Sequence, residues 1–229
     1  MKTGLELDTR SKLLKAAVSI FGKYGFAGAS VRQIADVAGV NHGSIKYHYS
    51  SKRDLWCATV SYLYDLMENA VMANSHRWGE MTPRERIIDS TRNYVRFSAA
   101  YPELQRIILF ETILESERGE WLSDNFIRPF TDRAINFTAL AQEQGVYSDK
   151  VPAMNLYYIS QAASRSLFVM AADIQRNFGV DVFEESEIER HIDAIVELLV
   201  LPEREAADAP RAGGGRNRPA NPPRKPHKI

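Results

Sequence analysis

The sequence has little of what a secreted, membrane-spanning or disulfide-stabilised protein needs. Cys57 is the single cysteine among 229 residues, so no internal disulfide can form. The longest apolar run, residues 194–201, is interrupted by Glu197 and is far shorter than the roughly 20 residues that span a bilayer. The first residues lack the charged start, apolar middle and small-residue cleavage site of a signal peptide. We therefore expect a cytoplasmic protein without a membrane partner.

Residues that carry catalysis or hold metals are also sparse. The sequence has five histidines, and none of them stands at metal-ligand spacing from another or beside a nucleophile motif. We expect no catalytic residue, no metal and no cofactor. An enzyme is therefore the weaker functional alternative.

Strand patterns are missing as well. No segment alternates apolar and polar residues for long enough to predict a strand, whereas apolar residues recur with a helical period along most of the chain. The predicted fold class is all-α. After a first helix that starts at Asp8 or Thr9 and ends at Gly25, helices are expected over residues 31–38, shortly after 41, and over 52–76, 82–101, 102–116, 119–145 with a kink or break at Pro129, 152–177 and 184–201.

The charges are unevenly distributed, although the formal net charge is zero. Residues 1–55 carry nine Lys or Arg against four Asp or Glu, and residues 203–229 carry seven against three. The intervening residues 56–202 hold thirteen against twenty-two. A basic head on an acidic body indicates that only the head contacts a polyanion. The alternative is that the charges belong to an ordinary solvated helical surface without a binding role.

The basic head contains the stretch SVRQIADVAGVNHGSIKYHYSSKRDL, residues 30–55. Ser30 and Gln33 form a capping-box pattern, which predicts that a helix begins at residue 31. Gly39 ends that helix, and Asn41 is a favourable N-cap for the next one. Two short helices joined by a turn that contains glycine indicate a helix-turn-helix.

The second of these helices carries hydrogen-bonding side chains where a duplex would be read. Reading DNA requires polar groups near the N-terminus of a helix in the major groove, together with cations for the flanking phosphates. The polar groups at this end and along the helix are Asn41, His42, Ser44, Lys46, Tyr47 and His48. The next helix begins with Lys52 and Arg53, which are unfavourable at a helix N-terminus unless a phosphate lies nearby; an exposed pair with a small local cost is equally consistent.

The segment GVNHGSIKYHYSSKRDL resembles the end of the helix-turn-helix in the TetR family of bacterial transcriptional regulators. That family has a Gly-Val turn, a short helix, an aromatic-His-aromatic run and a Ser-Lys pair, and the resemblance covers about residues 10–60. It departs at Lys46, where the family often has Tyr. The DNA-binding residues expected from the motif and the resemblance are Ser30, Arg32, Asn41, His42, Ser44, Lys46, Tyr47, His48 and Lys52.

The resemblance implies a three-helix DNA-binding head, residues 1–50, joined to a helical effector-binding and dimerisation body, residues 51–202. Residues 203–229 are rich in Pro, Gly, Ala and Arg, and this composition predicts a basic, disordered tail. The resemblance further implies a repressor that binds a palindromic operator on double-stranded DNA as a homodimer and is released by a small, largely apolar molecule. Such a protein would associate with the bacterial nucleoid when bound to DNA. A non-specific architectural DNA-binding protein and a ligand-independent regulator are the alternatives.

The family places its effector cavity in the middle of the body, where aromatic residues are abundant. The ligand-binding residues expected there are Leu66, Met67, Phe97, Phe110, Trp121, Phe130 and Phe168, although each could equally be an ordinary core residue. Dimerisation is expected through the last two long helices. Their apolar residues, among them Leu156, Ile159, Ile188, Ile192 and Ile195, would form half of a four-helix bundle, or would pack inside one monomer.

Overall fold

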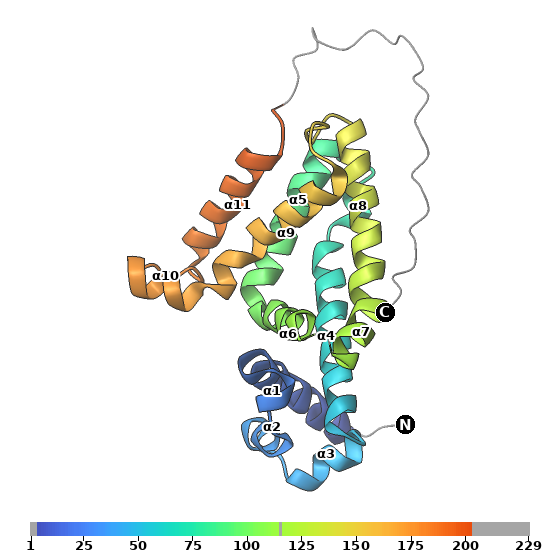
Figure 1. The fold of residues 1–229 in the computed structure, drawn as a ribbon, viewed down its shortest axis with the longest axis vertical. Coiled ribbons are helices and arrows are strands. Elements are labelled where there is room, and N and C mark those ends of the chain that lie inside the picture. The colour runs from blue at the N-terminus through green and yellow to red at the C-terminus, as the bar shows by residue number, and fades with distance from the viewer. Residues whose placement is uncertain (1–3, 115, 203–229) are drawn as a thin grey trace, which may run out of the picture.

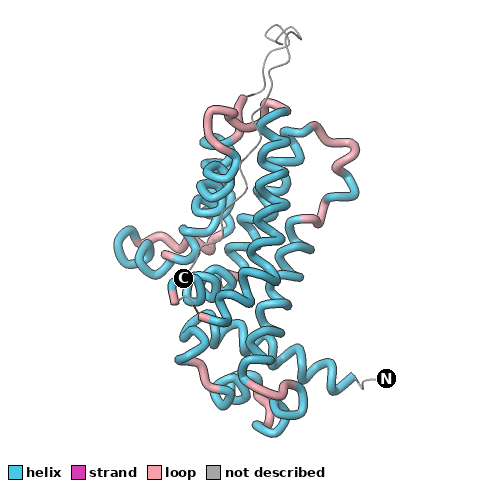
Figure 2. Tube along the Cα trace, turned by 45° about the vertical axis from the view of Figure 1, so that its right-hand side comes forward, coloured by secondary structure: helices cyan, strands magenta, loops and turns pink. Residues whose placement is uncertain are grey.

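All regular structure that the computed structural model describes is helical, which confirms the predicted class (Figure 2). The model describes residues 4–114 and 116–202; the predicted tail lies outside these ranges. The helices are α1 Gly4–Gly28, α2 Val31–Ala38, α3 His42–His48, α4 Lys52–Val71, η1 Ser75–Arg77, α5 Pro83–Ala100, α6 Pro102–Ile113, α7 Glu117–Leu122, η2 Ser123–Ile127, α8 Arg128–Glu143, α9 Ala153–Val169, α10 Ala171–Phe178 and α11 Glu185–Leu199. Within the described ranges, no helix has the length and apolar character needed to cross a membrane.

The helix-turn-helix forms as its capping residues predict. The Gln33 amide donates to Ser30 Oγ at 3.1 Å, and the Ser30 amide donates to Gln33 Oε1 at 2.9 Å. Gly39 ends α2 with φ at 64°, a left-handed conformation that glycine adopts without steric cost. Asn41 Oδ1 then accepts from the Gly43 amide at 2.9 Å and caps α3. These local interactions fix the angle between α2 and α3.

Two helices end earlier than the sequence pattern predicts. Helix α4 stops at Val71 instead of residue 76, because the following loop is tied to α5 by a hydrogen bond of 2.7 Å from Asn74 Nδ2 to Asp89 Oδ1. The helix expected over 152–177 is divided at Met170, and α10 then leaves in a new direction (Figure 1). Neither break has a proline or glycine to mark it.

The break near Pro129 follows the prediction. The chain forms α7, one π-helical turn, η2, and then α8, in which Pro129 lies in the first turn. The helical backbone runs on through this turn, where the Arg128 amide donates to the Ser123 carbonyl. Pro129 has no amide to donate to the preceding turn, so the regular α-helical pattern is interrupted next to it.

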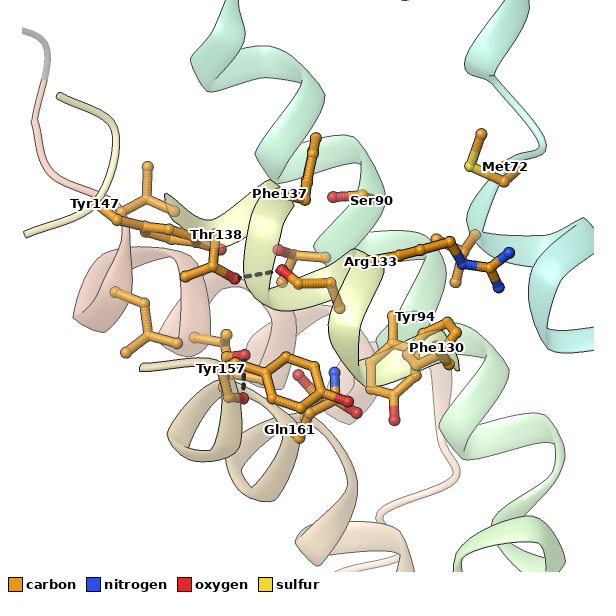
Figure 3. A pocket seen from close by; sticks show the side chains of 18 of the residues that line it. Met72, Ser90, Tyr94, Phe130, Arg133, Phe137, Thr138, Tyr147, Tyr157 and Gln161 are labelled. Atoms are coloured by element: carbon orange, nitrogen blue, oxygen red, sulfur yellow. Dashed lines mark hydrogen bonds between the residues drawn. The ribbon is translucent and has the colours of Figure 1, made fainter. Parts of the chain in front are cut away.

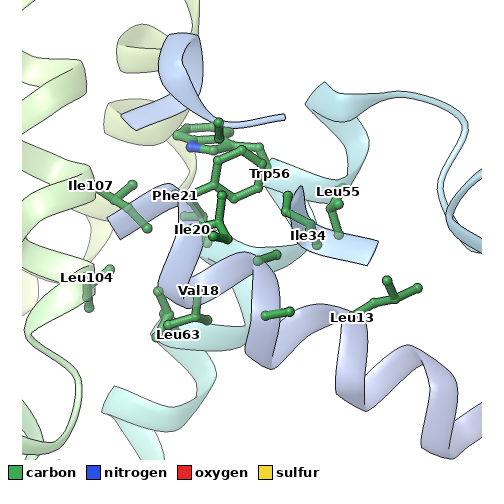
Figure 4. Close-up of a cluster of buried hydrophobic side chains, with 14 of the residues drawn as sticks. Leu13, Val18, Ile20, Phe21, Ile34, Leu55, Trp56, Leu63, Leu104 and Ile107 are labelled. Atoms are coloured by element: carbon green, nitrogen blue, oxygen red, sulfur yellow. The ribbon is translucent and has the colours of Figure 1, made fainter. Parts of the chain in front are cut away.

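One hydrophobic cluster joins the head to the body (Figure 4). Helix α1 packs against α2 and α4, and also against α6 of the body. Phe21, Ile34 and Leu55 from the head are fully buried in the same cluster as Leu104 and Ile107 of α6. The long helix α4 runs out of the head into the body, so it belongs to both parts (Figure 1).

The α11 isoleucines expected to pair two subunits lie instead inside this chain, whereas Ile159 of α9 remains exposed. Ile188, Ile192 and Ile195 of α11 are buried in a cluster with Val95 of α5 and Phe168 of α9. The monomer alternative was therefore correct for the α11 isoleucines. The apolar side chains that α9 does expose are Met154, Tyr158 and Ile159, each close to half exposed.

Candidate functional site

The exposed face of α3 carries most of the residues predicted to contact DNA. Ile45 and Tyr49 are 2% and 6% exposed and anchor α3 to the head. The opposite side of the helix presents His42, Lys46 and Tyr47 to solvent, and Tyr47 is 73% exposed. The helix lies at the end of the molecule farthest from the body (Figure 1). This arrangement leaves space for a DNA duplex beside α3.

The remaining predicted residues of the head support this face or flank it. Ser30 and Asn41 use their side-chain oxygens as helix caps, and Arg32 is exposed in the first turn of α2. Ser44 and His48 are partly buried, and the His48 ring lies edge-on to Tyr47 with 5.0 Å between centroids. Eight of the nine predicted side chains therefore lie on α2, α3 or their caps.

Lys52, the ninth residue, contacts the protein's own aromatic core. Its Nζ lies 4.5 Å from the centroid of the Phe26 ring, and the Arg118 guanidinium lies 4.0 Å from the same centroid. Burial, and then the Arg118 charge, lower the pKa of Lys52. Neighbouring Arg53 lies 3.7 Å from Glu117 at the start of α7. The two cations at the start of α4 therefore have protein contacts that the sequence did not indicate.

The Arg118 side chain also reaches a buried carboxylate. Glu111 of α6 is 1% exposed, and its Oε2 accepts from Ser116 Oγ at 2.6 Å. Arg118 donates from Nε to Glu111 Oε1 at 3.2 Å, and its Nη2 lies 3.2 Å from Oε2. Arg118 thus connects α6 and α7 of the body to Phe26 of the head.

The body contains a cavity of about 410 Å³ among α4, α5, α8, α9 and α11 (Figure 3). Aromatic and aliphatic side chains make most of its wall, with a few hydroxyls between them. The residues that line it are Glu68, Val71, Met72, Trp78, Ser90, Thr91, Tyr94, Phe130, Arg133, Ala134, Phe137, Thr138, Tyr147, Tyr157, Ser160, Gln161, Ser164, Ile195, Leu199 and Val200.

Several hydroxyls of the wall are already engaged. Thr138 Oγ1 donates to the Ala134 carbonyl at 2.9 Å, and Ser160 Oγ donates to the Tyr157 carbonyl at 2.8 Å. The charged members of the wall, Glu68 and Arg133, form an ion pair with each other, and both are exposed. Such a wall suits a largely apolar molecule whose few polar groups meet hydroxyls.

Of the seven residues predicted to bind a ligand, only Phe130 lines this cavity. Met67, Phe97 and Phe168 are core residues at most 4% exposed, and Leu66 and Trp121 pack against the head-to-body cluster. Phe110 is 39% exposed and lies outside the cavity. The aromatic residues that do line it, such as Trp78 and Tyr147, come from loops and helices far apart in sequence. No local pattern distinguishes them from core residues.

A metal site is not apparent in the part of the chain that the structure describes. No three residues among its histidines, Cys57 and its carboxylates are grouped closely enough to hold a metal ion there.

Comparison with known proteins locates the similarity chiefly in the head. Residues 13–58 match the family model described as bacterial regulatory proteins, tetR family. The probable HTH-type transcriptional regulator YttP of Bacillus subtilis is 25% identical over 112 residues, which are 49% of this chain and 54% of that protein. The HTH-type transcriptional repressor SCO4008 of Streptomyces coelicolor is 26% identical over 152 residues, 66% of this chain and 73% of that protein. With the first of these relatives, the chain thus shares about half of the length.

Solved structures extend the similarity of fold over the body. AibR, solved in complex with isovaleryl coenzyme A and operator DNA, superimposes with a TM-score of 0.65 at 18% identity and covers 83% of this chain and 97% of its own. The ketosteroid transcriptional regulator KstR2 of Mycobacterium tuberculosis gives 0.64 at 15% identity, over 84% and 95% of the two chains. The relatives described here are transcriptional regulators and not enzymes, in agreement with the prediction from the sequence.

Proposed function

Because the chain belongs to the TetR family of bacterial regulatory proteins, we propose that it is a sequence-specific transcriptional repressor that a small molecule releases from a palindromic operator. The head would read each half-site with α3. The cavity of the body would hold the small molecule. Of the structures compared, AibR was solved with both a coenzyme A thioester and operator DNA, which supports a design of this kind.

The observation that carries this proposal is that α4 belongs to both the head and the body. Leu55 and Trp56 at its start are buried in the core of the head. Glu68 and Val71 at its end line the cavity. A ligand that prefers one position of the end of α4 would shift the population of head positions by the difference between its affinities for the two states.

Two copies of the head are needed for a palindrome, and we propose that the copies pair through α9 and α11. The outward side of α9 carries Met154, Tyr158 and Ile159 and no charged residue, whereas Leu198 is 80% exposed on α11. Pairing would cover these apolar side chains. It would also make binding of the second half-site effectively intramolecular.

Selection of bound fragments from random DNA by the purified full-length protein tests the proposal. We expect a palindrome with half-sites one helical turn apart, bound at least about a thousandfold more tightly than competitor DNA at physiological salt. Equal affinity for the selected and competitor sequences would refute sequence-specific regulation and favour an architectural role. A selected site without twofold symmetry would refute pairing of two heads on the operator.

Substitutions then assign the contacts. We expect His42→Ala or Tyr47→Ala to change the preferred half-site, and Lys46→Ala to weaken binding to every sequence and lower the salt dependence by about one phosphate contact. Lys150→Ala is the matched control, because it removes an exposed lysine from the loop between α8 and α9. A loss with Lys150→Ala as large as that with Lys46→Ala would contradict the assignment.

A further inference from the structure

A cation without a carboxylate partner lies behind one wall of the cavity. Arg165 follows Ser164, a lining residue of α9, and its Nη1 donates to Gln105 Oε1 at 2.6 Å. The Gln105 amide lies 3.5 Å from the hydroxyl of Tyr94, which lines the cavity. Among the residues that the structure describes, no Asp or Glu lies within ion-pair distance of Arg165. Arg118, which is also partly buried, is paired with Glu111.

Three phenols surround this charge. Burial raises the pKa of Tyr94 to about 12 and also raises the pKa of Tyr64 and of Tyr157, while the positive charge of Arg165 acts on all three in the opposite direction. The raised pKa values leave the phenols protonated at neutral pH, and the hydrogen bonds through Gln105 connect Arg165 to the Tyr94 hydroxyl. Tyr94 and Tyr157 both line the cavity, and a protonated phenol can donate one hydrogen bond. The Tyr157 hydroxyl lies 3.3 Å from Thr131 Oγ1, where it can accept and so keep its own proton for a ligand.

The remainder of the wall is suited to the flat, apolar part of a ligand. Trp78 and Phe137 are stacked, with 6.1 Å between centroids and 16° between planes. The exposed Glu68 and Arg133 neutralise each other, so they give the cavity no net charge. The volume of about 410 Å³ is well above the roughly 150 Å³ of a cavity that holds benzene, and admits a molecule of about two fused rings.

We propose that the cavity binds a small aromatic carboxylate, whose rings lie among the aromatic side chains and whose carboxylate accepts hydrogen bonds from Tyr94 and Tyr157 in front of Arg165. A buried carboxylate is unfavourable unless it is hydrogen-bonded and its charge is compensated. The phenols supply the hydrogen bonds and Arg165 supplies the compensating charge. A neutral ligand would leave the positive charge of Arg165 without a negative partner. This inference rests on the proposed role of the cavity as the ligand site.

Isothermal titration calorimetry of the full-length protein near neutral pH tests it with two probes that differ in charge, 2-naphthoate and 2-naphthamide. The wild-type protein should bind the carboxylate at least about tenfold more tightly than the amide. Arg165→Met should bring the two affinities within about twofold by weakening only the carboxylate. Arg190→Met is the matched control: it removes an exposed guanidinium of α11 that lies outside the cavity, and it should retain the preference.

Two further variants exclude an effect of misfolding. Arg165→Lys keeps the charge and should keep part of the preference, and Tyr94→Phe removes one donor and should weaken the carboxylate more than the amide. Equal or tighter binding of the amide by the wild-type protein, or a preference that survives Arg165→Met, would overturn the proposal.

The outcome also separates this inference from the proposal on which it rests. Ala134→Phe places a ring in the cavity. If the amide binds, Ala134→Phe abolishes that binding, and the carboxylate is no tighter, the cavity remains a ligand site and only the preference for a carboxylate is wrong. If neither probe binds the wild-type protein, both proposals fail.

Discussion

Replacing Arg118 by methionine should destabilise the protein more than any exposed arginine replacement, because the substitution leaves a buried carboxylate without its cation. Glu111 is 1% exposed, and its oxygens meet only Ser116 Oγ and the Arg118 guanidinium among the interactions described. Breaking a buried pair from one side costs about 3 to 5 kcal/mol. The Arg118 side chain is 23% exposed, so water partly replaces it, and we expect the lower end of that range.

The loss of the contact with Phe26 adds a smaller term. The Arg118 guanidinium lies 4.0 Å from the centroid of that ring, and an interaction of this kind contributes about 0.5 to 1 kcal/mol. We therefore expect Arg118→Met to lower the free energy of unfolding by about 3.5 to 4 kcal/mol in urea titrations followed by circular dichroism.

A double-mutant cycle distinguishes this cause from a general packing defect. Glu111→Gln removes the charge, so the double variant Arg118→Met with Glu111→Gln should be more stable than the sum of the single losses predicts by at least about 1 kcal/mol. Arg128→Met, whose partner Asp124 is 60% exposed, is the control and should change stability by less than about 0.5 kcal/mol. Additive losses in the cycle, or an Arg118→Met variant as stable as the control, would refute the reasoning.

Two further predictions concern the cap of α2 and the partly buried His191. Ser30→Ala removes the side-chain oxygen that accepts from the Gln33 amide, and should lower the free energy of unfolding by about 1 kcal/mol, while Ser30→Asp, which can still cap, should not. Burial lowers the pKa of His191, and its hydrogen bond to the Ala163 carbonyl opposes this with a smaller effect. Near and below the pKa of a histidine in the unfolded chain, the unfolded chain therefore binds more protons than the folded protein. Stability should therefore fall as the pH drops below about 6.5, and His191→Gln should reduce that slope; an unchanged slope in urea titrations across this range would contradict the assignment.

The parts of the fold that depend on neighbouring residues could be predicted from the sequence. The Ser30 and Asn41 caps, the turn at Gly39 and the helix start after Thr82 rest on hydrogen bonds between residues at most four apart, and all four form. The end of α4 at Val71 depends on Asn74 reaching α5, which no local pattern reports.

The residues that line the cavity were harder to predict from the sequence for the same reason. Tyr94 and Phe97 lie on the same helix, are similarly apolar and are both buried, yet only Tyr94 borders the cavity. Which of them does so depends on where α8 and α9 pack, and helix packing is decided by the whole set of facing side chains. That no described carboxylate lies within ion-pair distance of Arg165 could not be predicted from the sequence either, because it depends on distances in the folded chain.

Two glycines of α1, Gly22 and Gly25, let this helix pack closely against α6. A Cβ at Gly22 would collide with the Glu103 side chain, and one at Gly25 would lie 3.4 Å from the Phe110 ring. Even the Cβ of residue 103 lies too close to a Cβ at Gly22, so a side chain at Gly22 requires glycine in place of Glu103 or a wider separation of α1 and α6. Sequence change at this contact is therefore coupled between the two positions, and a library that varies both together should recover folded variants that single substitutions miss.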